Sequence, residues 1–273
     1  MRACDGRRAL ATRAELLKLA RLLNRDPDQL SYLEVVAADD LRAFREQLTE
    51  VLFASSSKTL TRLAVASKLL PTGVVATIAQ RAFGPLLAAR VAGLLDPGRA
   101  VDVAAKLPPD FLADVAVELD PRRASKVIAA IPVSQIRAVT RELAGREEYV
   151  TMGRFVGHLP DASVYAALDE IDDRALLRIA FVLEHKERLD ELLEQLGGQR
   201  FEGLVEAAAD EDLWPEVLDV LGHVGPARQR ELAQLARKRD PDLYAQLEEF
   251  VRRQDSTLYQ RQREALEDGG QSS

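Results

Sequence analysis

The sequence contains a single cysteine and no long apolar run. Cys4 alone cannot form an internal disulfide or a thiolate metal site, which fits a reducing compartment. Residues 51–95 are the most apolar region, yet they carry five Lys and Arg residues, whereas a membrane span needs about 18 or more consecutive apolar residues. The first 23 residues also lack the uninterrupted apolar core of a secretion signal. These absences predict a cytoplasmic protein.

Motifs that carry catalysis are missing as well. The run Ser55–Ser57 has no nucleophile-elbow context, and no glycine-rich phosphate loop follows a predicted strand. The three histidines, His158, His185 and His223, are far apart and lack the spacing of metal ligands. We therefore predict a protein that is not an enzyme and holds no cofactor.

Charge is unevenly distributed along the chain. The net charge of −7 speaks against nucleic acid as a partner. Residues 51–95 nevertheless contain five basic residues and no acidic residue. Such polarisation steers a membrane surface or an acidic partner toward one part of a protein. The alternative is that two helix layers of complementary charge meet inside one molecule.

The composition favours helices. Ala, Leu, Arg and Glu dominate, while β-branched residues other than Val are few. Because the dominant residues are strong helix formers, we predict helix throughout the chain.

Leucine or isoleucine recurs every twelve residues in the middle of the chain. The positions are 95, 107, 119, 131 and 143 and, after a four-residue insertion, 159, 171 and 183. Asp or Pro follows each position that begins a repeat. Asp accepts hydrogen bonds from the first free amides of a helix, and Pro suits the first turn because it lacks an amide. Proline also disfavours helical geometry in the residue before it, so each repeat is predicted to end one helix and begin the next.

An apolar stripe runs through these repeats. The fifth and eighth residues after each repeat position are all apolar: Ala100, Leu112, Ala124, Ile136, Val164, Leu176, and Val103, Val115, Val127, Val139, Ala167, Ile179. This spacing is typical of one face of a helix of about nine residues, which is too short to be stable alone. The sequence therefore predicts an all-α superhelix, an α-solenoid with repeats of about twelve residues.

Longer helices are predicted to flank the repeats. We expect an N-terminal helical region over 1–90, the repeat domain over 91–196, a C-terminal helical cap over 197–262 and a disordered tail over 263–273. Three local signals belong to the flanks. Thr12 and Glu15 resemble a capping box at a helix start, Gly84-Pro85 predicts a break, and Trp214 is expected to be an apolar anchor at the head of a helix.

Two short motifs add a family resemblance. The L-D-P-x-R-A openings at Leu95–Ala100 and Leu119–Ala124 and the L-P-P junction at Leu107–Pro109 resemble the cytoplasmic N-terminal domain of MgtE-type magnesium transporters. That domain is a superhelix of short helices, and the similarity covers roughly residues 90–196. The middle domain of flagellar motor switch proteins is a more distant likeness.

The resemblance implies a regulatory role connected with Mg²⁺. In the transporters, acidic residues of this domain face paired CBS domains, and a membrane channel follows. Neither is found in these 273 residues, so we expect a stand-alone form without transport activity. The resemblance assigns no individual Mg²⁺ ligand.

Three carboxylates are the candidate metal ligands. Asp110, Asp114 and Glu118 lie four residues apart on one expected helix face, and Mg²⁺ needs only one or two carboxylates because it retains its waters. The alternative is salt bridging between neighbouring helices, since the next repeats carry basic residues at 122, 123, 126, 137 and 141.

The insertion at 144–159 is the one place where the twelve-residue rhythm is interrupted. Its side chains include types that are enriched at interface centres, and we predict a contact site at Tyr149, Met152, Arg154, Phe155 and His158. The alternative is a longer helix whose extra turn fills a gap in the core.

The leading hypothesis is a non-enzymatic cytoplasmic helical-repeat module that mediates protein–protein interaction, with 144–159 in its contact surface. One alternative is a Mg²⁺-responsive regulator that uses Asp110, Asp114 and Glu118. A second alternative, from another class, is a peripheral membrane adaptor that uses the acid-free stretch 51–95.

Overall fold

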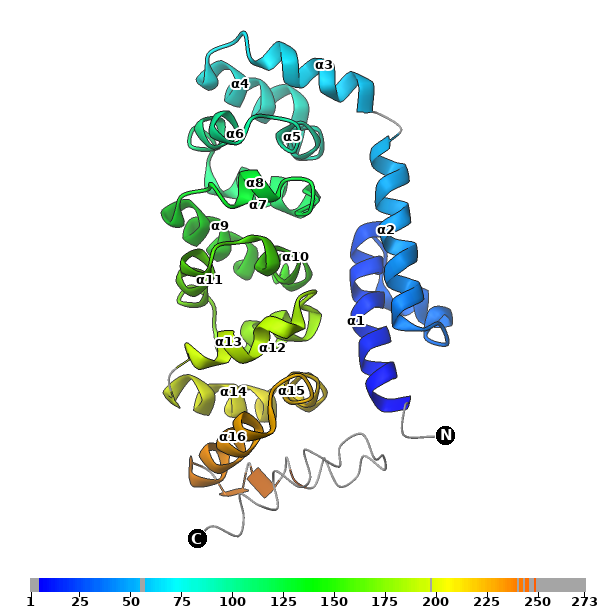
Figure 1. The fold of residues 1–273 in the computed structure, drawn as a ribbon, viewed down its shortest axis with the longest axis vertical. Coiled ribbons are helices and arrows are strands. Elements are labelled where there is room, and N and C mark those ends of the chain that lie inside the picture. The colour runs from blue at the N-terminus through cyan, green and yellow to red at the C-terminus, as the bar shows by residue number, and fades with distance from the viewer. Residues whose placement is uncertain are drawn as a thin grey trace. The chain divides into compact units, whose positions relative to one another are not determined.

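The computed structural model describes residues 5–54, 57–196 and 198–239, together with residues 241, 242, 244, 245 and 248 (Figure 1). Every regular element within these residues is a helix, as the composition predicts. The predicted disordered tail at 263–273 and the end of the predicted cap lie outside the described residues. None of the described helices combines the length and the apolar character that a membrane crossing requires.

The chain divides into two compact units whose boundaries differ from the predicted domains. Residues 1–43 and 172–273 form one unit, here called the terminal unit, and residues 44–171 form the central unit. Helix α2 (Ala38–Ala54) spans the first boundary. The other elements of the terminal unit are α1 (Asp5–Leu23), η1 (Pro27–Leu33), α12 (Asp173–Val182), η4 (Lys186–Arg188), α13 (Leu189–Glu194), α14 (Gly198–Asp210), α15 (Trp214–Leu221) and α16 (Pro226–Arg239).

The central unit contains the predicted repeats up to Ile171, and the repeat that follows, with α12, belongs to the terminal unit. Its elements are α3 (Ser57–Ser67), α4 (Thr72–Ile78), η2 (Ala79–Phe83), α5 (Gly84–Ala92), α6 (Pro97–Ala104), α7 (Pro109–Glu118), α8 (Ser125–Ile128), α9 (Val133–Gly145), α10 (Tyr149–Phe155), η3 (Val156–His158) and α11 (Asp161–Leu168). The π-helical turn η2 ends at Phe83 and is followed by Gly84, whose φ of 71° is a conformation that glycine adopts without strain. This confirms the predicted break at Gly84-Pro85.

Long-range contacts explain why the first helix belongs to the terminal unit. Helix α1 contacts α12 and α15, and α12 in turn contacts α14 and α15. Helices α1, α12 and α15 each provide a fully buried side chain, namely Leu19, Phe181 and Leu218. Burial of one such side chain stabilises a fold by about 1.5–3 kcal/mol. Trp214 is buried at the start of α15, as predicted.

The predicted capping box at Thr12 and Glu15 is wrong. Helix α1 begins at Asp5, so both residues lie inside the helix, and both are buried. The Thr12 hydroxyl donates to the carbonyl oxygen of Val36 at 3.3 Å, while Glu15 accepts from Lys18 at 2.9 Å. The Thr12 and Glu15 side chains make these contacts instead of capping, because the interior of a helix has no free amides.

Most helices of the repeat region begin where the sequence predicts. Helices start at Pro97, Pro109, Val133, Asp161 and Asp173. Asp96 and Asp172 cap two of them, because their carboxylates accept from the amides of Gly98 at 3.2 Å and Ala175 at 2.7 Å. The Asp and Pro signals therefore act locally, as expected for helix caps.

The repeat at 120–131 is the exception. A helix of about nine residues is predicted there, but residues 121–124 form a turn and α8 has only four residues. The Asp120 carboxylate accepts from the amide of Arg122 at 3.2 Å and also binds the side chains of Arg122 and Arg123. These contacts hold the chain in the turn, with Pro121 buried.

Helices of the central unit contact the next helix but one. Contacts link α3 to α5, α5 to α7, α7 to α9 and α9 to α11, while α4 contacts α6 and α6 contacts α8. The helices thus follow one another in two rows, and α3 and α4 are the first members of these rows (Figure 1). Helices this short gain their stability from such neighbours.

The predicted apolar stripe is buried in part. Ala100 and Val103 on α6 and Ala124 and Val127 in the repeat at 120–131 are buried. On α7 the predicted residues are only half-buried, and the buried ones are Phe111, Ala113 and Ala116. Helix α7 thus buries other positions than the predicted ones, between α5 and α9, which both contact it.

Candidate interaction surface

The segment that was predicted as a contact site lies largely in the core of the central unit. Tyr149 and Met152 are each only 9% exposed, and Thr151 beside them is fully buried. Phe155 is partly buried against the cluster of Ala89, Leu119, Ala124 and Ile128. A buried side chain does not touch a partner directly, so these positions favour the alternative in which the insertion fills the core.

Two further residues of this segment were predicted to make contacts. Arg154 is half-buried and donates from Nη2 to the carbonyl oxygen of Leu119 at 3.1 Å, within the central unit. His158 ends η3 and is also half-buried. The extra residues form a sharp turn after α9, in which Glu147 has a positive φ of 56° and the Glu148 amide donates to the Leu143 carbonyl at 3.0 Å.

The three candidate metal ligands on α7 do not share one environment. Asp110 and Glu118 are exposed, whereas Asp114 forms an ion pair with Arg146 at 2.5 Å. The hydrogen bond and the charge of Asp114 raise the pKa of Arg146 above its ordinary value. No group of three or more His, Cys, Asp or Glu side chains suited to a metal ion occurs among the described residues. Mg²⁺ binding by Asp110, Asp114 and Glu118 stays a prediction.

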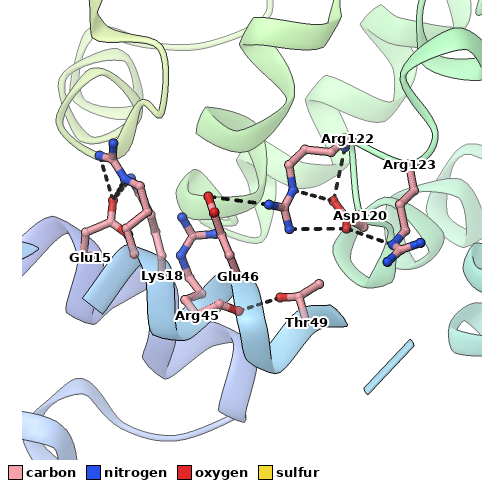
Figure 2. Close-up of polar contacts among 9 residues, drawn as sticks. Glu15, Lys18, Arg45, Glu46, Thr49, Asp120, Arg122 and Arg123 are labelled. Carbon is pink, nitrogen blue, oxygen red and sulfur yellow. Dashed lines mark hydrogen bonds and ion pairs between the residues drawn. The ribbon is translucent and has the colours of Figure 1, made fainter. Parts of the chain in front are cut away.

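Ion pairs do link helices, but with other partners than the sequence suggested. Figure 2 shows the Arg122 side chain between Asp120 and Glu46. Arg122 Nη1 lies 3.5 Å from Glu46 Oε1. Arg123 pairs with Glu50 on the same helix, α2. The four side chains that form the pairs with α2 are 29–63% exposed, so each pair contributes about 0–1 kcal/mol. These pairs join the central part of α2 to the turn at 121–124.

Four exposed apolar side chains of the central unit lie close together in sequence at the first helices of its rows, while Phe44, Leu86, Leu94 and Val133 are exposed elsewhere. Val65 is 57% and Leu69 86% exposed, and Leu70 and Val74 are 40% and 44% exposed. All four lie within ten residues, at the end of α3, in the connection to α4 and on α4. We call this group, together with the exposed Arg62, Lys68 and Arg81, the α3–α4 surface.

Backbone and side-chain hydrogen bonds hold the connection in place. The amides of Leu69 and Leu70 donate to the carbonyls of Ala66 and Ser67 at 3.1 and 3.2 Å, so the chain continues in tight turns beyond α3. Arg99 donates from Nη2 to the carbonyl oxygens of Ser67 and Leu70. The apolar side chains are therefore displayed on an ordered turn, which reduces the entropy that binding would cost.

The α3–α4 surface carries uncompensated positive charge. Arg62, Lys68 and Arg81 are exposed, and none of them forms an ion pair with any residue that the structure describes. No acidic residue occurs anywhere between 51 and 95. This favours the interpretation in which the acid-free stretch attracts an outside partner over the one in which its charges are neutralised within the molecule.

A buried charged cluster in the terminal unit was missed by the sequence analysis. Lys186, 17% exposed, pairs with Asp219, 2% exposed, and lies 5.4 Å from the Phe181 ring. Nearby, Glu15 pairs with Lys18 at 2.9 Å. The one available signal was Lys18 among the leucines of "LLKLARLL", which places a charge on the apolar face of α1.

Burial governs the chemistry of this cluster. Burial lowers the pKa of Lys186 below its ordinary value of 10.5, and the charge and hydrogen bond of Asp219 oppose this effect. His223 donates from Nδ1 to the Asp219 carbonyl oxygen at 2.7 Å. The cluster joins η4 to α15, and we assign it a structural role.

Comparison of the chain with protein-family models, with curated proteins and with solved structures gives no match. The resemblance to the magnesium-transporter domain therefore stays a prediction.

Proposed function

We propose that this chain is a non-enzymatic helical-repeat module that binds an acidic segment of a partner protein through the α3–α4 surface. One observation carries the proposal: Val65, Leu69, Leu70 and Val74 are exposed within ten residues, across the end of α3, the ordered connection and α4, in a stretch that has basic residues and no acids. Large apolar side chains that gather on a surface and are bordered by charge are typical of interaction sites.

The architecture gives the exposure a physical reason. We interpret the two rows of the central unit as a short-helix solenoid with repeats of about twelve residues, supported by the helix starts at Pro97 and Pro109 and by the contacts between alternate helices. In such stacks each repeat covers the apolar face of its neighbour, and terminal repeats usually carry a polar outer face. Here α3 and α4 stand at the start of the rows and expose apolar residues. The surface is thus an uncapped end that a partner can cover.

Charge favours a protein over a membrane as the occupant. Recognition of anionic lipid typically uses about four to eight clustered Lys and Arg residues. Three exposed basic side chains are described on this surface, together with four aliphatic ones. That balance fits an acidic amphipathic protein segment, whose apolar residues would cover Leu69 and whose carboxylates would pair with Arg62, Lys68 and Arg81. The segment 144–159 is not part of the proposed surface.

Affinity capture tests the proposal. The full chain and its Leu69→Asp/Val74→Asp variant are used as bait, with Val133→Asp as the matched control at another exposed aliphatic residue of the central unit. We expect the double variant to lose captured proteins by about tenfold or more, because it adds repulsion and removes apolar contact. Circular dichroism verifies that all three are folded.

Two outcomes would contradict the proposal. Capture that is equal for the wild type and the double variant would remove the α3–α4 surface from the account. Co-sedimentation with vesicles of anionic phospholipid, if abolished by the same two substitutions while protein capture is unchanged, would replace the protein partner by the membrane alternative.

A further inference from the structure

A second segment of the chain has the opposite charge to the α3–α4 surface. Residues 26–40, here called the η1 segment, contain five acidic residues and no basic residue. Asp26, Asp28, Glu34, Asp39 and Asp40 are all exposed, and none forms an ion pair with a residue in the described part of the chain. The segment therefore presents uncompensated negative charge.

The η1 segment also exposes apolar side chains. Val35 is 92% exposed and Tyr32 69% exposed, which makes Val35 the most exposed of the large apolar residues described. Both belong to the same short stretch as the carboxylates of Glu34 and Asp39. An acidic amphipathic segment is the chemistry that the α3–α4 surface fits, since that surface pairs basic side chains with Leu69 and Val65.

Local contacts anchor the η1 segment on its own unit. The Asp26 carboxylate accepts from the Asp28 amide at 2.9 Å and starts the 3₁₀ helix η1. Leu30 is buried, η1 contacts α1, and the Val36 carbonyl accepts from the Thr12 hydroxyl at 3.3 Å. Tyr32 and Val35 are consequently held outward on a fixed backbone, as a preformed binding element would hold them.

We propose that the partner covering the α3–α4 surface is the η1 segment of a second copy of this chain. This inference rests on the proposed function and names its partner. Opposite charges and matching aliphatic side chains favour the contact between the two different surfaces. A contact of like with like is disfavoured, because two α3–α4 surfaces or two η1 segments would repel each other.

The contact joins two different surfaces, and each chain carries both of them. Two copies can make it reciprocally, as a two-fold symmetric dimer, or once, which leaves one α3–α4 surface and one η1 segment free for further copies. Exposed charges are screened over about 10 Å at 0.1 M salt, so the association is expected to weaken as salt is raised.

Complementation between two variants tests this inference. The surface variant Leu69→Asp/Val74→Asp keeps an intact η1 segment, and the segment variant Tyr32→Ala/Val35→Lys keeps an intact α3–α4 surface. In sedimentation velocity, we expect the wild type to self-associate at low salt and each variant alone to associate about tenfold or more weakly. An equal mixture of the two variants is expected to form a 1:1 dimer that does not grow further. Thermal melting verifies that both variants are folded.

The outcomes of this experiment test the second copy as the partner separately from the proposed function. A wild type that stays monomeric at every concentration, or a mixture that forms no dimer, would overturn the inference. If the surface variant still loses captured proteins in the affinity experiment, only the identity of the partner is wrong and the proposed function stands. If wild type and surface variant capture the same proteins and neither self-associates, both proposals fail. Unchanged self-association of either variant alone would likewise overturn the contact between the α3–α4 surface and the η1 segment.

Discussion

The substitution Asp219→Ala is expected to lower the free energy of unfolding by about 3–5 kcal/mol. Asp219 is 2% exposed and pairs with Lys186, which is 17% exposed. Removing the carboxylate leaves a buried ammonium group without its counter-charge, and burial already lowers the pKa of Lys186. Urea unfolding followed by circular dichroism measures the effect.

A double substitution separates the pair from its surroundings. Lys186→Met together with Asp219→Leu is expected to recover most of the lost stability, because a buried ion pair replaced by apolar residues of similar size is often neutral. Asp114→Asn, which breaks the exposed pair with Arg146, provides the matched control and is expected to cost about 1 kcal/mol or less. An Asp219→Ala variant as stable as this control would show that the Lys186–Asp219 pair does not stabilise the terminal unit.

The substitution Met152→Ala is expected to destabilise the protein by about 2–5 kcal/mol. Met152 is 9% exposed on α10, and shortening it removes apolar contacts and leaves a cavity in the central unit. Chemical unfolding measures the change, with Val133→Ala at an exposed position as the control, which is expected to change stability by about 0.5 kcal/mol or less. Full stability of Met152→Ala combined with lost partner capture would restore the contact-site interpretation of 144–159.

Much of the local structure could be predicted because its causes are local. Asp96 and Asp172 cap helices through amides two and three residues further along, so the sequence alone contains both groups of each hydrogen bond. The same reasoning fails at Asp120, whose carboxylate also binds two arginine side chains and holds a turn. The pattern at Asp120-Pro121 is the same, but the side-chain contacts that decide its conformation are not part of the pattern.

Features that depend on distant residues could not be predicted. Glu15 is paired with Arg42, 27 residues away, and α1 contacts α12 and α15, which lie more than 140 residues further along the chain. A capping-box spacing at Thr12 and Glu15 contains no information about these neighbours. The domain boundaries differ for the same reason, since the terminal unit joins both ends of the chain.

The candidate surface was only partly visible in the sequence. The lack of acids over 51–95 pointed to this region, and the charge argument named an acidic partner as one interpretation. Apolar residues such as Val65 and Leu69 look like core residues in a sequence, however, and their exposure depends on which helices cover them. The residue types of 144–159 could not decide between a contact site and core packing, because types that are enriched at interfaces, such as Tyr149 and Met152, also fill cores.

Photo-crosslinking from position 69 tests the central claim most directly. A benzophenone side chain replaces Leu69 in one version of the full chain and Val133 in the control, and both are irradiated in cells that express them. We predict a crosslinked adduct from position 69, at the mass of two chains if the partner is a second copy, and little or none from position 133. Adducts of equal yield from both positions, or no adduct from position 69, would contradict the assignment of the α3–α4 surface as the binding site.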